Sequence, residues 1–576
     1  METDGASFIR DGLDVDFIVI GSGGAGLTGA LTAAIKGLRV VVLEKTGLIG
    51  GTTAVSGGTS WIPNNHHEEE VGVPDSREEA LAYLQACIVG TGDPTHINAL
   101  VDYGPEVIRF LEDEGGMEFL ATRPGGSSMD YRSWLPGAKV GGRALIVGKT
   151  STAPFGEFAE RLRISHTSAW TFDPRDYNSE AMHLDAPGTQ RPGASVFVPP
   201  TGEEAPIPED IARGAALVAQ LVRGGLAHGV DYRVDTRAEE ILVEDGRAVG
   251  VRVTGSDGES QVLRASAGVL VATGGYSHDE ELKRLWLSRR IDYSCELESN
   301  SGDGHRMGMA IGAQTAGIGD AWWMPHVPLG SDNSIVNTAG SREDRSLPHV
   351  IIVNDQGKRF MNESINYHDV GKYFDSVVGG WEQNFPAWLV FDSHAAKRYA
   401  VLAWKVPDEG AEVPEYLRIG DSLADLARAM EVDPERFEAT VDRFNGFART
   451  GIDADYQRGE TAYDRAWGDP ANTPNPCLGE LAEGPFYAVR MYAGALSTRG
   501  GLRVDDRGRV YSAATQQPIP GLYAAGNCSS GGPTSCYPGP GATLGAALTF
   551  GYLAATDAAS AAQSMDRSDA LASATA

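Results

Sequence analysis

Short apolar runs alternate with helix-like segments near the N-terminus of the chain, and this pattern predicts an α/β fold. Residues 16–20 form an apolar strand, a helix of small residues follows over 27–36, and residues 38–43 form a second apolar strand. Two later apolar runs, 268–275 and 521–527, each end in a glycine turn and predict further buried strands. The chain therefore begins with a strand-turn-helix-strand unit.

The turn after the first strand has the spacing of a dinucleotide-binding motif. It reads G-S-G-G-A-G over residues 21–26, and Glu44 ends the second strand 18 residues after Gly26. Glycines at these positions permit a tight turn and bring a pyrophosphate close to a helix N-terminus, whereas the carboxylate accepts hydrogen bonds from ribose hydroxyls. Because strand, turn, helix and acid are in register, the unit predicts dinucleotide binding.

Two helices farther along the chain are specified by their first turns. A capping box at 76–79 opens a helix that continues through Cys87. Asp433, followed by Pro434, places an N-cap and a proline at the first helical position ahead of residues 435–449. Both helix starts are expected to be well defined.

Other segments have weaker patterns. Residues 230–258 predict a β-meander of three strands, the first of them at 231–234. Between about 145 and 205 no clear period is present, which indicates a long irregular insertion. The segment rich in alanine, serine and aspartate from Asp557 is expected to fray.

Composition narrows the class of protein. A chain of 576 residues is too long for one core, so two or more domains are expected. The net charge of −30 argues against a nucleic-acid partner and an anionic membrane surface. No apolar run approaches the roughly 20 residues of a membrane span, and the first 16 residues lack a secretory signal. Five cysteines without a C-x-x-C spacing predict a cytoplasmic protein with no disulfide frame and no zinc site or other metal.

A loop near the C-terminus carries the strongest chemical signal. It reads Y-P-G-P-G over residues 537–541, just ahead of a helix start near Ala542. Prolines stiffen the backbone between Tyr537 and Gly541. A phenol and a backbone N–H held in this way can stabilise a carbonyl oxygen as an oxyanion hole does, and one such donor contributes roughly 3 kcal/mol to transition-state stabilisation.

These motifs and their order resemble the flavoprotein family that includes succinate dehydrogenase, fumarate reductase and 3-ketosteroid Δ1-dehydrogenase, most closely the last, from about residue 14 to about 560. The stretches that carry the resemblance are E-K at 44–45, G-G-T-T at 50–53, S-G-G at 56–58, W-I-P-N-N at 61–65, S-G-D-G at 301–304, K-R-F-M-N-E-S at 358–364 and the loop from 537 to 545.

The resemblance implies a Rossmann-like α/β FAD-binding domain that is split by an inserted α+β catalytic cap domain. Residues 1–283, with the irregular insertion, and 485–565 would bind FAD, residues 284–484 would form the cap, and residues 566–576 would be a flexible tail. Covalently flavinylated relatives have a histidine in the stretch that corresponds here to 52–58, which has none. FAD is therefore expected to be bound non-covalently.

The resemblance also implies which residues contact FAD: glycines at the pyrophosphate, Glu44 at the ribose, Ala238 at the adenine, and Asn527 with Leu544 at the flavin end. The full set is Gly21, Gly23, Gly24, Gly26, Glu44, Lys45, Thr52, Thr53, Ser56, Gly57, Gly58, Ala238, Gly274, Asn527 and Leu544.

Desaturation next to a ketone removes a proton from the α carbon and a hydride from the β carbon, so it needs a base, oxyanion donors and a flavin. In the steroid dehydrogenases the donors are the tyrosine and the last glycine of Y-P-G-P-G, here Tyr537 and Gly541. The base is a tyrosine four residues after the glutamate of R-F-x-N-E-S, here Tyr367. Fumarate reductases have an arginine proton donor at about this position, so the tyrosine favours ketone oxidation.

The chain departs from the family at three places. A supporting tyrosine corresponds to Tyr131, but the next family tyrosine is Arg132 here. The segment between Pro328 and Pro348 is polar where the family has steroid-facing aromatics, and residues 528–536 are also atypical. These departures bear on the substrate rather than on the reaction.

The leading hypothesis is therefore FAD-dependent 1,2-desaturation of a 3-oxosteroid. The alternative is the same reaction on a smaller cyclic ketone, such as a cyclohexanone. A soluble fumarate reductase and a non-catalytic flavin-binding redox sensor are less well supported. A second Rossmann motif is missing from the sequence, so the external electron acceptor is expected to be quinone-like rather than a nicotinamide.

Overall fold

A mainly parallel sheet is the centre of the N-terminal half of the computed structural model, and the predicted strand-turn-helix-strand unit at its core is confirmed. β1 (Asp14–Ile20) leads into α1 (Gly24–Ile35), and β2 (Val40–Leu43) follows. β1 pairs in parallel with β2 on one side and with β11 (Ser260–Val271) on the other. The structure describes residues 14–88, 93–125, 128–164, 207–287, 289–328, 338–340, 344–374, 377–378, 381–399, 401, 413, 416–532 and 536–575.

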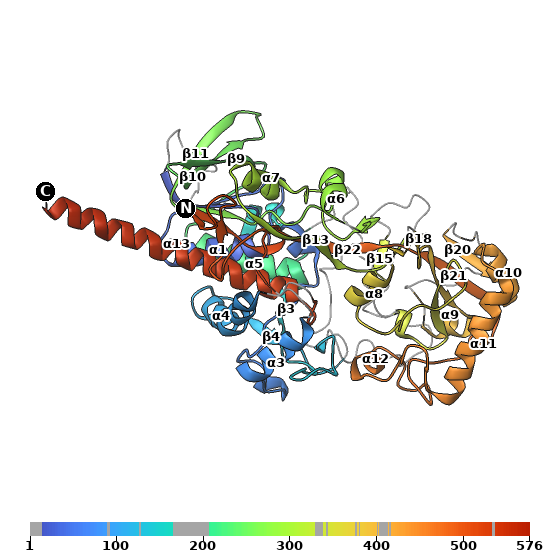
Figure 1. Ribbon diagram of the computed structural model, residues 1–576. Coiled ribbons are helices and arrows are strands. Elements are labelled where there is room, and N and C mark those ends of the chain that lie inside the picture. The colour runs from blue at the N-terminus through green and yellow to red at the C-terminus, as the bar shows by residue number, and fades with distance from the viewer. Residues whose placement is uncertain are drawn as a thin grey trace.

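The sheet has eight strands, and its main order is β23-β24-β11-β1-β2-β8. The strands not yet given are β8 (Asp231–Arg233), β9 (Arg237–Glu244), β10 (Arg247–Thr254), β23 (Arg509–Tyr511) and β24 (Pro518–Ala524). α1, α5 (Arg213–Ala227) and α13 (Ala542–Thr575) lie together against one face of this sheet (Figure 1) and share one hydrophobic core. The sheet thus joins chain segments that lie hundreds of residues apart.

The predicted β-meander is correct for two of its strands and wrong for the first. β9 pairs with β10, and β10 pairs with β11, all antiparallel. β8 instead pairs in parallel with β2, at the edge of the large sheet. A short apolar segment ahead of a hairpin has the same local pattern in both arrangements, so only the tertiary contacts distinguish them.

The two helix starts predicted from their caps are confirmed. Ser76 accepts a hydrogen bond from the Glu79 N–H at 3.2 Å, at the start of α3 (Arg77–Cys87). Asp433 accepts one from the Arg436 N–H at 3.1 Å, at the start of α11 (Pro434–Thr450).

Part of the expected irregular insertion has regular structure. Residues 144–164 contribute β5 (Ala144–Val147), β6 (Thr150–Ser151) and η3 (Ala153–Arg161). β5 lies between β3 (Ser60–Trp61) and β4 (Phe119–Ala121). The rest of the expected insertion, from 165 on, lies outside the described residues, as does most of the polar segment between Pro328 and Pro348.

A second sheet, with order β16-β19-β21-β20, forms the centre of the other half of the molecule, at the right of Figure 1. Its strands are β16 (Val350–Asn354), β19 (Ala387–Phe391), β20 (Leu417–Gly420) and β21 (Phe486–Met491), and all pairs are antiparallel. Hydrophobic clusters cover both faces of this sheet. β21 begins just after residue 484, the expected end of the cap, and pairs with β19 and β20.

A three-stranded sheet, β12 (Tyr293–Ser294), β22 (Gly494–Leu502) and β13 (Thr315–Trp323), connects the two halves. The remaining elements are α2 (Gly51–Val55), η1 (Glu69–Val71), α4 (Pro94–Asp113), β7 (Asp210–Ile211), α6 (Glu280–Trp286), α7 (Asp303–Ala310), β14 (His326–Pro328), β15 (Thr338–Gly340), η7 (Asp344–Ser346), α8 (Tyr367–Phe374), β17 (Val377–Val378), β18 (Trp381–Glu382), α9 (Ser393–Tyr399), α10 (Leu423–Ala429), α12 (Ala462–Ala466) and η9 (Gly526–Cys528).

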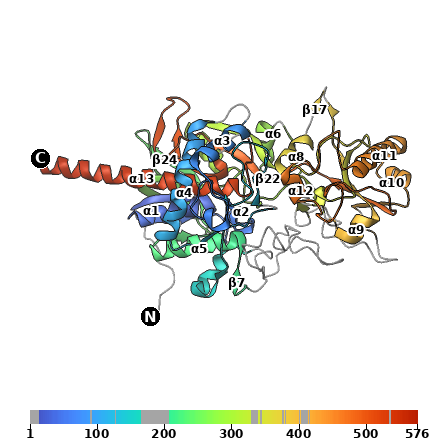
Figure 2. The ribbon, with the colours of Figure 1, turned by 90° about the horizontal axis from the view of Figure 1, so that it is seen from below.

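The segment from Asp557, which is expected to fray, is helical in the structure. α13 continues through Thr575 and extends away from the body of the molecule (Figures 1 and 2). Alanine has the highest helix propensity, which explains why a segment without a hydrophobic period is still helical. Across the described ranges, none of the helices combines the length and the apolar composition that crossing a membrane requires.

Candidate active site

One cavity of about 320 Å³ joins the carboxyl ends of β1, β2 and β11 to the start of α13 and to a cluster of tyrosines. All but one of the residues singled out from the sequence lie on its wall. These are Gly21, Gly23, Gly24, Glu44, Lys45, Thr52, Thr53, Ser56, Gly57, Gly58, Ala238, Gly274, Asn527, Leu544, Tyr131, Tyr367, Tyr537 and Gly541.

Gly26 is the exception, and its position explains its role. A Cβ at Gly26 would lie 2.1 Å from the Gly21 carbonyl oxygen, so the third glycine lets α1 pack closely on the turn rather than lining the cavity. Gly21 itself has φ +103°, and a Cβ there would lie 2.4 Å from the Ala272 oxygen. The turn therefore requires glycine at both positions, but for two different reasons.

The carboxylate of Glu44 is buried at the end of β2, where it is held by protein donors. One of its oxygens accepts hydrogen bonds from Ser22 Oγ at 2.6 Å and from the Ser22 N–H at 3.3 Å. The other accepts from the Thr46 N–H and from Thr46 Oγ, both at 2.9 Å. Four donors fix the orientation of this carboxylate. A ribose hydroxyl would therefore donate to an oxygen that already accepts two hydrogen bonds from the protein.

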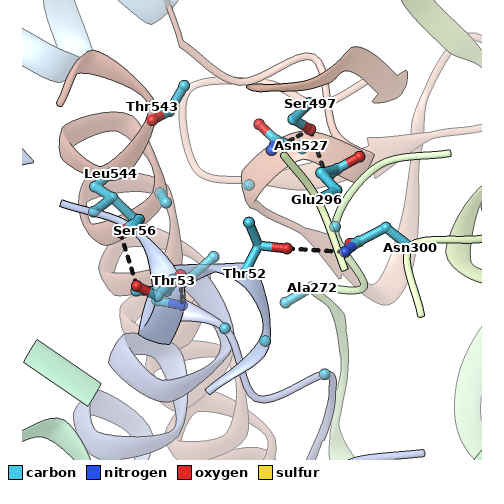
Figure 3. Close-up of a pocket in the computed structure, with 18 of the residues that line it drawn as sticks. Thr52, Thr53, Ser56, Ala272, Glu296, Asn300, Ser497, Asn527, Thr543 and Leu544 are labelled. Carbon is cyan, nitrogen blue, oxygen red and sulfur yellow. Dashed lines mark hydrogen bonds between the residues drawn. The ribbon is translucent and has the colours of Figure 1, made fainter. Parts of the chain in front are cut away.

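The long wall of the cavity includes residues that carry no recognisable motif. Thr52 accepts a hydrogen bond from Asn300 Nδ2 at 2.9 Å, and Asn527 donates from Nδ2 to Ser497 Oγ at 2.7 Å (Figure 3). Ser497 in turn donates to Glu296 at 2.6 Å. Burial raises the pKa of Glu296, although Ser277 and Ser497 also donate to it. Sequence reasoning missed Glu296, Asn300 and Ser497, and their only local signal is the S-G-D-G stretch that follows Asn300.

The start of α13 approaches the cavity closely because Gly541 has no side chain. Gly541 has φ +85°, and a Cβ there would lie 2.1 Å from the Thr59 oxygen. Its carbonyl oxygen accepts a hydrogen bond from the Trp61 N–H at 3.1 Å. Within the described part of the chain its own N–H has no hydrogen-bond partner. An orphan N–H on a cavity wall is a ready donor to a ligand oxygen.

Three tyrosines from three distant segments meet at one end of the cavity. The ring centroids of Tyr131 and Tyr367 are 5.4 Å apart, and each of these rings lies 5.5 Å from the ring of Tyr537. The Tyr131 hydroxyl donates to the Tyr367 hydroxyl at 3.0 Å. All three side chains are at most 4% exposed. The arrangement puts two phenol groups in direct contact inside a buried space.

The walls next to the tyrosines are mostly apolar. Trp322 packs edge-on against Tyr537 with ring centroids 5.2 Å apart, and its Nε1 donates to Asn527 Oδ1 at 3.0 Å. Met324, Cys295 and Leu496 complete this part of the lining. Such walls suit an apolar ring.

A hydrogen-bond network holds the loop that carries Tyr537. The carbonyl oxygen of Pro538 accepts from the Tyr83 hydroxyl at 2.5 Å and from the Tyr131 N–H at 2.9 Å. Trp61 Nε1 donates to Asp130 at 2.9 Å, and Asp130 also pairs with the buried Arg143 at 2.7 Å. The loop is therefore attached to the same segment that supplies Tyr131.

Arg132, the departure from the family pattern, ties the three tyrosine-bearing segments together. Its guanidinium makes two hydrogen bonds to Asp369, at 2.7 and 2.8 Å. Asp369 lies two residues after Tyr367 on α8, and Arg132 also donates to the Tyr537 carbonyl oxygen at 3.4 Å. Because its two terminal nitrogens bind different segments, one guanidinium joins α8 to the loop that carries Tyr537.

The R-F-x-N-E-S motif has a structural role ahead of α8. Arg359 makes two hydrogen bonds to Glu363, both at 2.7 Å, and a third to Asp453 at 2.8 Å. All three groups are buried. Glu363 lies four residues before Tyr367, so this ion-pair cluster anchors the segment that positions the tyrosine.

These features fit FAD: glycine turns with no room for a side chain, the buried carboxylate of Glu44, and a wall of hydroxyl and amide groups that leads to the tyrosines. Thr53 and Leu544 lie close together on the cavity wall, since a Cβ at Gly24 would contact both side chains (Figure 3).

Known proteins share this fold. A family model described as an FAD binding domain matches residues 16–544. The chain is 39% identical to 4-oxocyclohexanecarboxylate 2-dehydrogenase of Sinomonas cyclohexanicum, with 97% of this chain and 95% of the relative covered. It is 38% identical to 3-oxosteroid 1-dehydrogenase of Mycolicibacterium smegmatis, with 96% and 98% covered. A crystal structure of 3-ketosteroid Δ1-dehydrogenase from Sterolibacterium denitrificans in complex with 1,4-androstadiene-3,17-dione matches with a TM-score of 0.84 and 30% identity, over 95% of this chain and 100% of that one.

Proposed function

Because the chain belongs to the FAD-binding flavoprotein family that includes the 3-oxosteroid 1-dehydrogenases, we propose that it oxidises a 3-oxosteroid to the 1,2-unsaturated ketone. The observation that carries this proposal is the contact between Tyr131, Tyr367 and Tyr537 on the wall of the cavity that the FAD motifs also line.

Each tyrosine has a separate task in this reaction. Tyr367 removes the proton from the α carbon, and the Tyr131 hydroxyl, which already donates to Tyr367, stabilises the negative charge that this phenol carries when it acts as a base. The Tyr537 O–H and the Gly541 N–H donate to the ketone oxygen as negative charge develops there. FAD, when bound, supplies the oxidant that accepts hydride from the β carbon.

The buried position of the three phenols is part of the mechanism. Hydrogen bonds to a developing oxyanion are stronger in a site from which water is excluded, because the local dielectric constant is lower. Trp322, on β13, and Met324 provide that exclusion. The same apolar surface positions a ring substrate without a polar anchor.

A smaller cyclic ketone is the second candidate substrate, and a relative of nearly equal similarity supports it. The identity to the enzyme that acts on 4-oxocyclohexanecarboxylate is 39%, against 38% for the steroid enzyme. Both names describe desaturation beside a ring ketone, so they agree on the chemistry and differ in substrate size. The proton and oxyanion roles given above are the same for either substrate.

Several accompanying features are part of the same proposal. FAD is bound without a covalent bond, since the stretch from Thr52 to Gly58 has no histidine. The reduced cofactor passes its electrons to a quinone-like acceptor. All five cysteines are free, which is consistent with a cytoplasmic location. The chain is divided into a split FAD-binding domain and a cap. β21 belongs to the cap because it pairs within the β16-β19-β21-β20 sheet.

The test is an anaerobic titration of the holoenzyme, with the visible absorbance of the oxidised flavin as readout. 4-Androstene-3,17-dione, 4-oxocyclohexanecarboxylate and succinate are added separately at equal concentration. Bleaching by the steroid supports the leading proposal, and bleaching by 4-oxocyclohexanecarboxylate alone supports the second candidate. Bleaching by succinate alone would overturn both.

A further inference from the structure

A cluster of two histidines and a glutamate lies outside the active site, between the turn after β3 and the last turn of α4. His66 Nε2 lies 2.8 Å from one oxygen of Glu112, and His67 Nε2 lies 2.8 Å from the other. The centroids of the two imidazole rings lie 4.1 Å apart, and the ring planes are tilted by 37°. The ligand atoms all lie within 4.8 Å of one another.

We propose that His66, His67 and Glu112 form a binding site for a divalent transition-metal ion of the zinc type. Two imidazole nitrogens and one carboxylate are the ligand set that zinc takes when three protein groups bind it, with the fourth position open to water. Tetrahedral coordination at usual bond lengths separates ligand atoms by about 3.4 Å. If Glu112 binds through Oε1, its present distance of 2.8 Å from His67 Nε2 would have to lengthen by about 0.6 Å.

Both ring nitrogens of His67 face a carboxylate. Nδ1 lies 3.1 Å from Glu70 on η1, and Nε2 lies 2.8 Å from Glu112. Zinc would replace the proton on Nε2, and the Nδ1 proton would keep Glu70 as its acceptor. A carboxylate behind a histidine is the usual outer-shell arrangement at metal sites. His66 Nδ1 has no hydrogen-bond partner within the described ranges, so a proton there breaks no existing bond.

The cluster is accessible to an ion but not fully exposed. The side chains of His66, His67 and Glu112 are 29%, 12% and 17% exposed. Glu112 Oε1 also accepts from the Phe119 N–H at 3.2 Å, which fixes the carboxylate. Two carboxylates, Glu70 and Glu112, contact the histidines and favour a cation, and the charge of Arg109 opposes one.

We expected no zinc site because the cysteines lack a C-x-x-C spacing. That argument applies only to sites with thiolate ligands. Nitrogen and oxygen ligands from adjacent histidines and a distant glutamate, 45 residues farther along, have no spacing motif. A bound ion would join the turn at His66 to the end of α4. That turn follows Trp61 and Ile62 in the chain. The Trp61 N–H, at the end of β3, donates to the Gly541 carbonyl oxygen.

The experiment uses the full-length holoenzyme after treatment with a chelator, with Zn²⁺ binding measured by isothermal titration calorimetry. Wild type is expected to bind one Zn²⁺, and H67Q and E112Q are each expected to bind it at least tenfold more weakly. The matched controls are H228Q and E114Q, which change an exposed histidine and an exposed glutamate and are expected to bind as wild type does. Mg²⁺, which prefers oxygen ligands, is expected not to compete.

A second measurement keeps the test valid for variants of lower stability. Zn²⁺ is expected to raise the thermal unfolding midpoint of wild type and of both controls, and to leave the midpoints of H67Q and E112Q unchanged. Equal zinc affinity in H67Q, E112Q and wild type would overturn the proposal, as would a wild-type protein that binds no zinc. Neither measurement depends on the proposed enzyme activity.

Discussion

At the scale of single residues, the contact between two phenols is what distinguishes this site from a general flavin pocket. Tyr131 donates to Tyr367 at 3.0 Å, and the ring of Tyr537 stacks on that of Tyr131 at an angle of 20°. A tyrosine is a weak base, so its use in proton abstraction depends on a donor that stabilises the phenolate. The donor and the base come from segments 236 residues apart.

Replacing Tyr131 by phenylalanine removes that donor and keeps the ring. A hydrogen bond to a charged group contributes about 1.5–3 kcal/mol, so we expect kcat to fall roughly 10- to 100-fold in Y131F with little change in KM. Steady-state kinetics with the preferred ketone measures this. Y463F is the matched control, because Tyr463 packs on Tyr131 without lining the cavity. Equal losses of kcat in Y131F and Y463F would show that Tyr131 acts through packing and not through its hydrogen bond.

Replacing Tyr537 by phenylalanine tests the oxyanion donor. Loss of one such donor costs roughly 2.7–4 kcal/mol of transition-state stabilisation, so kcat is expected to fall about 100- to 1000-fold. The flavin absorbance of purified Y537F is expected to match wild type, because Tyr537 is assigned to the substrate. Full activity in Y537F would remove Tyr537 from the mechanism, and loss of flavin would reassign it to cofactor binding.

At the scale of elements, α8, the 537–541 loop and the segment that carries Tyr131 act as one unit through Arg132. Its bidentate pair with Asp369 is partly buried, with 15% and 22% of the two side chains exposed. Arg132 uses Nη2 for both oxygens of Asp369 and Nη1 for the Tyr537 carbonyl oxygen, and lysine has only one nitrogen for these contacts. The position of Tyr367 relative to Tyr131 therefore depends on a contact that neither tyrosine makes.

We expect R132K and D369N each to lower kcat about tenfold, which corresponds to about 1.4 kcal/mol. The double variant is expected to be no worse than either single one, because both changes break the same pair. Comparing kcat of the four proteins measures the coupling. If the two losses multiply in the double variant, Arg132 and Asp369 act separately.

Element patterns also show what the sequence could predict. The first strand-turn-helix-strand unit and the caps of α3 and α11 are set by neighbours within a few residues, and those predictions are confirmed. β8 was assigned to the wrong partner because pairing is decided by contacts across the fold. The motif residues could be assigned to a cofactor site because each motif lies within a few consecutive residues. Trp322, Glu296 and Asn300 belong to no such motif and reach the cavity only through the tertiary fold.

At the scale of the whole molecule, buried histidines make stability depend on pH. Burial lowers the pKa of His305 on α7 from 6.5 to about 4. Between these values the unfolded chain binds a proton at this position and the folded chain does not, so the free energy of unfolding falls as the pH falls from 6.5 towards 4. The slope from one such group is at most about 1.4 kcal/mol per pH unit.

The variant H305Q keeps an N–H for the Gly500 carbonyl oxygen, which His305 Nε2 approaches at 3.0 Å, but it does not titrate. The fall in its thermal unfolding midpoint between pH 7 and pH 5 is therefore expected to be smaller than that of wild type. H228Q changes an exposed histidine and is expected to keep the wild-type dependence. Identical pH profiles for H305Q and wild type would show that His305 does not contribute.

The active site lies where the two halves of the molecule meet. Tyr131 and Tyr537 come from the part built around the large sheet, and Tyr367 starts α8 beside the second sheet. Any change in the relative position of the halves therefore changes the distance between base and oxyanion donors. This makes the whole fold, rather than one loop, responsible for the spacing of the three phenols.

The most direct measurement is a single turnover under anaerobic conditions, in which oxidised holoenzyme is mixed with 4-androstene-3,17-dione and the decay of flavin absorbance is followed in wild type and Y367F. Wild type is expected to lose the absorbance and to form the 1,4-diene. Y367F is expected to bind the same amount of FAD but to react at least about 100-fold more slowly, because it lacks the base. Reduction of Y367F at the wild-type rate would contradict the account.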